Sequence, residues 1–249
     1  VFHGDTDRVP SGQLTGGSRS VQIAGSSMGD AADKLIELAR EAAADLLEAA
    51  PGDIVLDRER GAFHVAGSPT AARSWAEIAG DAGEPLVGLS DFAQAGATFP
   101  FGTHIAVAEV DTETGHATVE RIIAVDDAGV IINPLLAAGQ IHGGLAQGIA
   151  QALLEEFRYD EDGNPQTSNL ADYTAISMME VPMYERSFTE TSTPRNPLGA
   201  KGIGEAGSIG STPAVQSAVI DALAPFGIRH LDMPLTPERI WSALQSSGA

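Results

Sequence analysis

The spacing of apolar residues predicts a chain of mixed helices and strands. Between residues 30 and 50, alanine and leucine recur at intervals of three and four positions, charged residues take the other face, and Pro51-Gly52 ends the segment. This pattern is typical of an amphipathic helix. Capping residues or early prolines also mark helix starts in four further segments: 68–80, 133–157, 211–227 and 236–244.

Two of these helices have distinctive starts and interiors. The helix near residue 211 is expected to begin at Ser211 or Thr212, with Pro213 just inside it. The helix that follows Asn133-Pro134 contains four glycines, each of which destabilises an isolated helix by about 1 kcal/mol. We therefore expect another backbone or a ligand to approach this helix closely. The four glycines are Gly139, Gly143, Gly144 and Gly148.

Runs of β-branched residues predict strands beside the turns. Residues 53–67 read as two short strands, residues 101–129 as a strand pair around the turn DTETG, and residues 185–193 as a further strand. Strands and helices do not alternate regularly, so the predicted fold class is α+β, with mixed sheets and packed helices. The glycine-rich residues 1–29 are expected to be loop. The polar stretch near residue 96 divides the chain into expected subdomains 1–96 and 97–249.

Composition narrows the classes of function. The chain has 249 residues, of which 43% are hydrophobic, and this is enough for a real core. Its formal net charge of −20 repels nucleic acid and anionic membranes, so we exclude nucleic-acid binding. The absence of cysteine excludes disulfides, iron–sulfur clusters and thiolate zinc sites within this chain. No apolar run in the sequence suggests a membrane span.

One carboxylate stands in an unusual context. Glu205 lies within NPLGAKGIGEAGSIGSTPAV, a run of glycines, small hydroxyl residues and prolines. One interpretation is structural: the carboxylate stabilises the start of a helix, or pairs with Lys201 four residues earlier. The other interpretation is a general base placed where the backbone must pass close to a cofactor. The residues alone leave both open.

Two other segments offer weaker chemistry. The stretch TGGSRS presents Gly17, Ser18, Arg19 and Ser20, whose N–H groups, hydroxyls and guanidinium suit an anion, but taken alone the pattern is weak and a flexible loop explains it better. Gln140 follows Gly139, and its amide can read the edge of a heterocycle unless it simply faces solvent. Gln147 is interpreted as structural.

The histidines show no metal-ligand spacing, and we interpret all of them as structural or surface residues. They are His3, His64, His104, His116, His142 and His230. No GxSxG motif is present, which excludes an α/β-hydrolase interpretation.

These signals occur in a recognisable order. The blocks HGDTDRVPSG…TGGSRSVQIAGS, AGQIHGGLAQGIAQALLEE, LGAKGIGEAGSIGSTPAVQSAVIDAL and HLDMPLTPERIW follow one another along the chain. In this order the chain resembles the C-terminal half of the molybdopterin-binding large subunit of the xanthine oxidase, aldehyde oxidase and carbon monoxide dehydrogenase family. The resemblance covers essentially the whole chain and implies the fold of the second molybdopterin-binding domain.

The resemblance also implies roles for individual residues. Glu205 matches the general base beside the molybdenum, which deprotonates the metal-bound hydroxyl so that the product oxygen comes from water. Gln140 matches a glutamine that hydrogen-bonds the pterin. The loop Gly17, Ser18, Arg19 and Ser20 matches a cofactor contact. Lys201, Gly202 and Gly204 shape the loop that presents Glu205. No side chain of this chain is expected to ligate the metal.

The family likeness implies further partners and cofactors. These are the N-terminal half of the large subunit, an iron–sulfur small subunit, an FAD-binding medium subunit, a small-molecule substrate and the cytosine dinucleotide form of molybdopterin with molybdenum. A dimer of heterotrimers is expected, located in the cytoplasm or attached to the membrane through its partners. Because the chain opens without Met, we expect a fragment or one product of a split subunit.

The expected activity is oxidation of an aldehyde, an N-heterocycle or carbon monoxide. Carbon monoxide oxidation in this family uses a copper-binding cysteine on a loop of the missing half, so the present sequence does not choose among these substrates. The alternative is a non-catalytic scaffold or assembly module that retains the fold. Glu205 in an intact GIGE loop favours the enzyme, since a scaffold has no need of that carboxylate.

Overall fold

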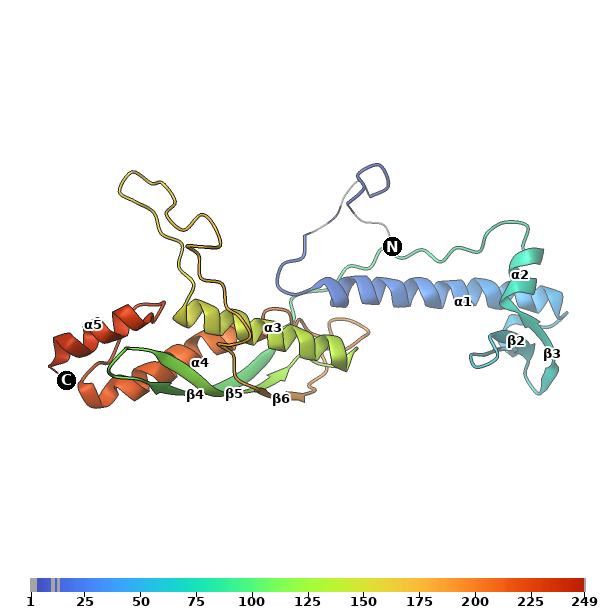
Figure 1. The fold of residues 1–249 in the computed structure, drawn as a ribbon. Helices are drawn as coiled ribbons and strands as arrows, with labels where there is room; N and C mark the ends of the chain where they lie inside the picture. The colour runs from blue at the N-terminus through green and yellow to red at the C-terminus, as the bar shows by residue number, and fades with distance from the viewer. Residues whose placement is uncertain (1–3, 10–11, 13, 249) are drawn as a thin grey trace. The chain divides into compact units, whose positions relative to one another are not determined.

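The structure is a computed structural model that describes residues 4–9, 12 and 14–248 (Figure 1). His3, interpreted from sequence as structural, lies outside the described residues. The chain forms two compact units: Val21–Ala95, and a second that joins Val1–Ser20 to Gly96–Ala249. The loop with Gly17 and Ser18 thus groups with the Glu205 region, whereas the sequence-based division placed it in 1–96. That division into two subdomains stays a prediction.

The unit Val21–Ala95 is a small sheet beside a long helix. Strands β1, β2 and β3 pair antiparallel in that order, and the buried side chains of Ile54, Phe63 and Ile78 join Ala39 and Ala43 of α1 in one core. The elements are a π-helix Val21–Gly25, α1 (Ser26–Leu46), a 3₁₀ turn Pro51–Asp53, β1 (Ile54–Asp57), β2 (Ala62–Val65), β3 (Ser68–Ser74) and α2 (Trp75–Asp81). The predicted helix after residue 30 and the two strands of 53–67 are confirmed.

Two expectations for this unit are wrong. Residues 21–29 are helical where a loop was expected, although glycine and serine have weak helix propensity: they form the π-helix and the first turn of α1, and Gln22 and Ser26 are buried there. Residues 68–74 form β3 where a helix was expected. The helix starts only after Ser74, whose hydroxyl accepts from the Glu77 N–H while the Glu77 carboxylate accepts from the Ser74 N–H.

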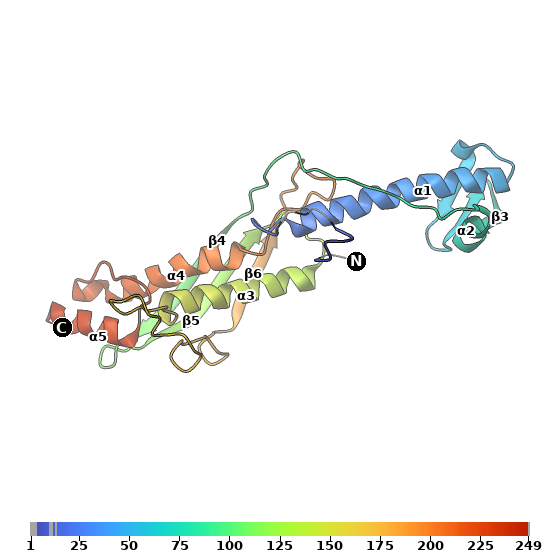
Figure 2. The same cartoon turned by 90° about the horizontal axis from the view of Figure 1, so that it is seen from above.

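The second unit packs helices against a three-stranded sheet (Figure 2). Strand β5 lies in the centre, antiparallel to β4 and parallel to β6, and α3 and α4 lie side by side over the sheet. The shared core includes Ile122 of β5, Ile141 and Leu145 of α3, and Val215 and Val219 of α4. The elements are β4 (Phe101–Val110), β5 (Ala117–Asp127), α3 (Pro134–Leu153), β6 (Tyr184–Thr189), α4 (Ala206–Leu223), a 3₁₀ turn Ala224–Phe226 and α5 (Pro237–Ser247).

Most predicted elements of this unit are confirmed, and so is the mixed α/β class with packed helices. Helix α3 is capped by Asn133, whose side chain accepts from the N–H groups of Leu135 and Leu136, and α5 is capped by Thr236. No helix among the described residues combines the length and apolar character that crossing a membrane requires.

The predicted start of α4 is wrong. The helix begins at Ala206 and not at residue 211, so Pro213 lies inside it. Pro213 removes one internal hydrogen bond. This cost is outweighed because one face of the first two turns packs closely on α3: Ser211 is fully buried, and Gly207 and Ser211 lie directly against Gly144 and Gly148 of α3. The early start places Glu205 at the N-cap, directly before the first helical residue.

Candidate functional site

Glu205 is held at the start of α4 by Ser18, which is distant in sequence. The Ser18 hydroxyl donates to Glu205 Oε2 at 2.6 Å, and Ser18 Oγ accepts from the Glu205 backbone N–H at 3.1 Å. Ser18 reaches this position with φ 54°, directly after Gly17 with φ 69°. Few residues other than glycine adopt this left-handed conformation. The reciprocal contact thus depends on an unusual backbone at Ser18.

Glycines allow the two segments to approach. A Cβ atom on Gly202 would lie 2.8 Å from the Ser18 Cβ and 2.9 Å from its carbonyl oxygen. A Cβ on Gly204 would lie 3.1 Å from Ser18 Oγ and 3.3 Å from Gln140 Oε1. A larger residue at Gly202 would push the two segments apart, whereas one at Gly204 would only press on the ends of the Ser18 and Gln140 side chains. The structure therefore brings together four of the residues that sequence selected: Ser18, Gln140, Gly204 and Glu205.

The exposed face of α3 beside this cluster is open. Gln140 is exposed, and its amide makes no hydrogen bond with any residue that the structure describes. A Cβ on Gly139 or Gly143 would meet no atom within 4 Å. Gly144 and Gly148 instead face α4, where an added Cβ would lie 2.7 Å from the Gly207 Cα and 1.8 Å from the Ser211 Oγ. Packing against α4 thus explains two of the four helix glycines and leaves the other two unexplained.

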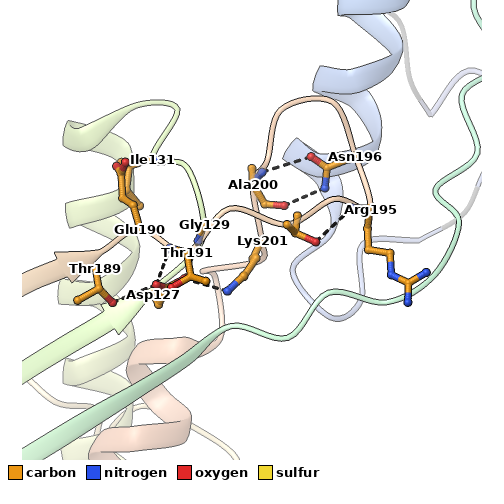
Figure 3. Close-up of polar contacts among 11 residues, drawn as sticks. Asp127, Gly129, Ile131, Thr189, Glu190, Thr191, Arg195, Asn196, Ala200 and Lys201 are labelled. Atoms are coloured by element: carbon orange, nitrogen blue, oxygen red, sulfur yellow. Dashed lines mark hydrogen bonds and ion pairs between the residues drawn. The ribbon is translucent and has the colours of Figure 1, made fainter.

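Lys201 does not pair with Glu205, so that structural alternative is wrong. Its ammonium group lies 2.9 Å from Oδ1 of Asp127 at the end of β5, and its side chain is only 8% exposed. Figure 3 shows this contact together with the other donors to Asp127. Lys201 also lies over the Phe101 ring, 4.7 Å from its centroid. Lys201 therefore acts inside the loop and its ammonium is not presented at the surface.

Asp127 is a fully buried carboxylate with four donors. Its Oδ1 accepts from Lys201 Nζ and from the Gly129 N–H at 3.0 Å. Its Oδ2 accepts from the Thr189 hydroxyl at 3.0 Å and from the Thr191 N–H at 2.7 Å. Although burial alone raises the pKa of Asp127, these hydrogen bonds outweigh it, and the pKa is strongly lowered. The group is therefore a carboxylate at neutral pH.

The backbone around Lys201 is fixed to the end of β5 by further hydrogen bonds. The Lys201 N–H donates to the Ala128 carbonyl at 2.7 Å, and the Val130 N–H donates to the Gly199 carbonyl at 3.0 Å. The Asn196 side chain closes a ring with Ala200, donating to its carbonyl at 2.8 Å and accepting from its N–H at 3.2 Å (Figure 3). The loop before Glu205 is therefore rigidly attached up to Lys201.

Other selected residues lie outside the Glu205 cluster. Arg19 donates from Nε and Nη2 to the Leu14 carbonyl at 3.3 and 2.9 Å, and the Ser20 hydroxyl contacts the Thr15 hydroxyl at 2.6 Å. Both side chains thus make their contacts within their own loop. Gln147 is exposed on α3.

Among the described histidines, His104 is nearly buried and lies 3.1 Å from Asp126. The structure therefore gives this histidine a carboxylate partner inside the fold. Within the part of the chain that the structure describes, no three His, Asp or Glu side chains are grouped as a metal site would require.

The sequence interpretation missed Asp127. The only signal was the pair of acids in VDDAG at the end of an apolar strand. Side chains of consecutive strand residues point to opposite faces, so one of two adjacent acids in a covered strand must enter the interior. Such a carboxylate needs a cation or several donors. Applied to Asp126 and Asp127, this argument predicts buried partners for one of the two acids, and in the structure both are buried.

Comparison with known families now places the chain. A model described as molybdopterin cofactor-binding domain matches residues 1–182. The chain belongs to this family. It is 40% identical over 253 aligned residues to the carbon monoxide dehydrogenase large chain of Hydrogenophaga pseudoflava, with 98% of this chain and 31% of that protein covered. That alignment extends well beyond residue 182, the end of the family-model match.

Two solved structures share the fold. Carbon monoxide dehydrogenase from Oligotropha carboxidovorans superposes with a TM-score of 0.86 at 34% identity, covering 98% of this chain and 31% of its own. Quinoline 2-oxidoreductase from Pseudomonas putida 86 superposes with a TM-score of 0.82 at 38% identity, covering 93% of this chain and 30% of its own. The chain thus spans about a third of the length of these relatives. The resemblance inferred from the sequence blocks is confirmed.

Proposed function

We propose that this chain is part of a molybdenum hydroxylase and that Glu205 is its general base. The observation that carries the proposal is the state of the Glu205 carboxylate. It is exposed, Ser18 orients one of its oxygens, and Gln140 and the open face of α3 lie beside it. Membership of the molybdopterin cofactor-binding family supports the presence of a cofactor at this position.

The residues around Glu205 fit a molybdopterin. Gly202 leaves no room for a side chain against Ser18, and Gly204 leaves little room against Ser18 and Gln140, so the backbone itself lines this part of the site. The Gln140 amide, with no partner among the described residues, offers a donor and an acceptor in one plane to a heterocycle edge. The loop Gly17 to Ser20 would contact the same cofactor. The bound group would supply two-electron redox chemistry.

The role of Glu205 follows from its two oxygens. Oε2 accepts the Ser18 hydrogen bond, while Oε1 has no partner among the residues that the structure describes. The carboxylate is therefore fixed in orientation yet retains an oxygen that can accept a proton from a water or hydroxyl beside the cofactor. A positioned base of this kind contributes about 10²- to 10⁴-fold to a rate.

The assembly and substrate are part of the same proposal. The relatives are about three times as long, which supports an N-terminal region of the large subunit as partner. Iron–sulfur and FAD subunits, the cytosine dinucleotide form of the pterin and a cytoplasmic location follow from family likeness. The relatives named above act on carbon monoxide and on quinoline, so the substrate is an aldehyde, an N-heterocycle or carbon monoxide.

The test is Glu205→Gln in the complete enzyme, a change that keeps the size and removes the base. We expect kcat to fall at least about 100-fold while molybdenum and pterin contents stay near those of the wild type. Glu238→Gln is the matched control, since Glu238 is an exposed carboxylate in the first turn of α5, and it should leave kcat unchanged. Wild-type turnover by the Glu205 variant would refute the base. A purified complex without molybdenum and pterin would favour the scaffold alternative.

A further inference from the structure

We propose that Asp127, through its ion pair with Lys201, is the positioning residue that fixes the Glu205 loop. This inference rests on the proposed function, because it concerns where the proposed base is held. Nothing in the sequence patterns or in the family comparison assigns a role to Asp127. Its side chain touches neither Glu205 nor the open face of α3, so its effect on the site passes through Lys201.

The first step of the argument is that this contact is built into the fold. The Asp127 side chain has no exposed area, and that of Lys201 is 8% exposed. All four hydrogen bonds to Asp127 come from residues outside β5: Gly129, Thr189, Thr191 and Lys201. Three of these donors lie in segments that the sheet already holds close. Lys201 alone comes from the loop that leads to Glu205.

The second step concerns the short connection between Lys201 and Glu205. Only Gly202, Ile203 and Gly204 separate them, and neither glycine has a side chain with which to hold the loop. Four residue steps span at most roughly 14 Å when extended. What fixes Lys201 therefore restricts Glu205 from the loop side, while Ser18 and the start of α4 hold it from the other side. Ile203, packed against the core beside α4, gives the connection its only side-chain anchor.

The third step is that the ion pair favours one position of the loop over other positions close to it. If Lys201 moved away, Asp127 would remain as a buried charge with three neutral donors, which is a strongly unfavourable state. Alternative loop positions are therefore disfavoured by the electrostatics of Asp127. A base displaced by about 1 Å can lose about 100-fold in rate, so this restraint bears directly on turnover.

The test compares two ion pairs that both involve β5. Lys201→Met removes the buried charge and keeps the chain length. Arg121→Met is the matched control, because Arg121 pairs with Glu185 across β5 and β6 with both side chains at least half exposed. Each variant is made in the complete enzyme. Hydrogen–deuterium exchange of the peptide covering residues 199–206 is measured first, followed by kcat, KM and molybdenum content.

For Lys201→Met we expect exchange in 199–206 to rise at least tenfold, with β5 and α3 peptides unchanged. We also expect kcat to fall about 10- to 100-fold with KM within twofold, because the base is displaced and the substrate contacts remain. Arg121→Met should match the wild type in every measurement. Unchanged exchange in 199–206 would overturn the inference, as would exchange that rises equally throughout the unit, since that indicates a purely structural role.

If Lys201→Met does not assemble, a second variant still tests the proposal. Lys201→Gln retains a donor toward Asp127 without the charge, and it should show the same local increase in exchange with a smaller loss of kcat. The exchange result does not depend on the identity of the base. If Glu205→Gln keeps its activity while exchange rises as expected, the proposed function fails and the positioning role of the ion pair stands.

Discussion

Asp127 and Glu205 are two carboxylates at the two ends of the short segment Lys201–Glu205: Asp127 binds Lys201 at its start, and Glu205 is its last residue. They differ in burial and in the number of hydrogen bonds they accept. Asp127 has no exposed side-chain area and accepts four hydrogen bonds, including one from an ammonium group. Glu205 is exposed, and Ser18 is its side chain's partner among the described residues. A carboxylate whose acceptor positions are filled holds structure in place. A carboxylate with a vacant oxygen and access to solvent can exchange a proton.

The position of Glu205 depends on the contacts of Asp127, but the contacts of Asp127 do not depend on Glu205. The Asp127 contacts would persist without Glu205, whereas Glu205 has its position from Lys201 on one side and from the start of α4 on the other. The proposed base, Glu205, thus lies at the less restrained end of a segment whose other end, Lys201, is firmly held. The following predictions test this division from the largest expected effect to the smallest.

Replacing Asp127 with Asn should cause the largest loss of stability. The amide removes the charge opposite Lys201 and turns an NH₂ group toward an existing donor, so we expect a loss of about 3–5 kcal/mol. The measurement is a urea titration followed by Trp241 fluorescence in a Trp75→Phe background, since the two tryptophans lie in different compact units. Asp232→Asn, at a 93% exposed carboxylate, should stay within about 0.5 kcal/mol of the wild type.

Comparing the wild type with Asp127→Asn at different pH values gives a further test, because the direction of the stability change is fixed. The pKa of Asp127 is lowered in the folded state, so its contribution to stability is complete above the unfolded value of about 3.9 and declines as the pH falls below it. The stability difference between wild type and Asp127→Asn should therefore be constant from pH 7 to 5 and shrink toward pH 2. A difference that grows on acidification would contradict a buried, ionised Asp127.

Adding a methyl group to Gly144 should disturb the other support of Glu205. A Cβ there would lie 2.7 Å from the Gly207 Cα and 2.8 Å from the Ser208 nitrogen, so Gly144→Ala must push back the first turn of α4. We expect a loss of about 1–3 kcal/mol in the same urea titration.

Gly143→Ala is the control for that change, one residue away on α3. Nothing lies within 4 Å of a Cβ at this position, and alanine is the better helix former, so stability should rise by up to about 1 kcal/mol. Equal effects of the two alanines would show that α3 and α4 do not pack as described.

Removing the Ser18 hydroxyl should have the smallest effect. Ser18→Ala removes two hydrogen bonds, one to the Glu205 carboxylate and one from the Glu205 N–H. Because Glu205 is exposed and water can replace them, stability should change by about 1 kcal/mol or less. If the hydroxyl orients Glu205, kcat should nevertheless fall several-fold while KM stays constant. Thr15→Ala, at an exposed hydroxyl of the same loop, should leave both values unchanged. A kcat equal to that of the wild type in Ser18→Ala would leave the orientation of Glu205 to the backbone alone.

Sequence reasoning was most successful where the signals are local. Period and capping predicted α1, α3, α5 and the β4–β5 pair, since apolar spacing and a polar N-cap act within one segment. It was wrong for α4, because Pro213 is a strong local signal for a helix start. The deciding contact was made by Ser211 and Gly207 against α3, more than sixty residues earlier in the chain.

The candidate site likewise contains residues that the sequence predicted and a contact that it did not. Sequence blocks selected Ser18, Gln140, Gly204 and Glu205, and the structure brings these four together. They did not predict that Lys201 would face Asp127, because the pairing joins residues 74 positions apart. A lysine four residues before a glutamate suggests a local pair, and only the buried acceptor at the end of β5 makes the distant pair more favourable.

The amino-acid sequence by itself determined the helices and strands with clear period, the family resemblance, and the small residues that let two backbones meet at Glu205. The tertiary structure alone decided which carboxylate is buried and which is exposed. That decision depends on burial and on donors drawn from separate segments, namely Gly129, Thr189, Thr191 and Lys201 around Asp127. A charge can leave water only where such partners converge, and convergence is a property of the folded chain.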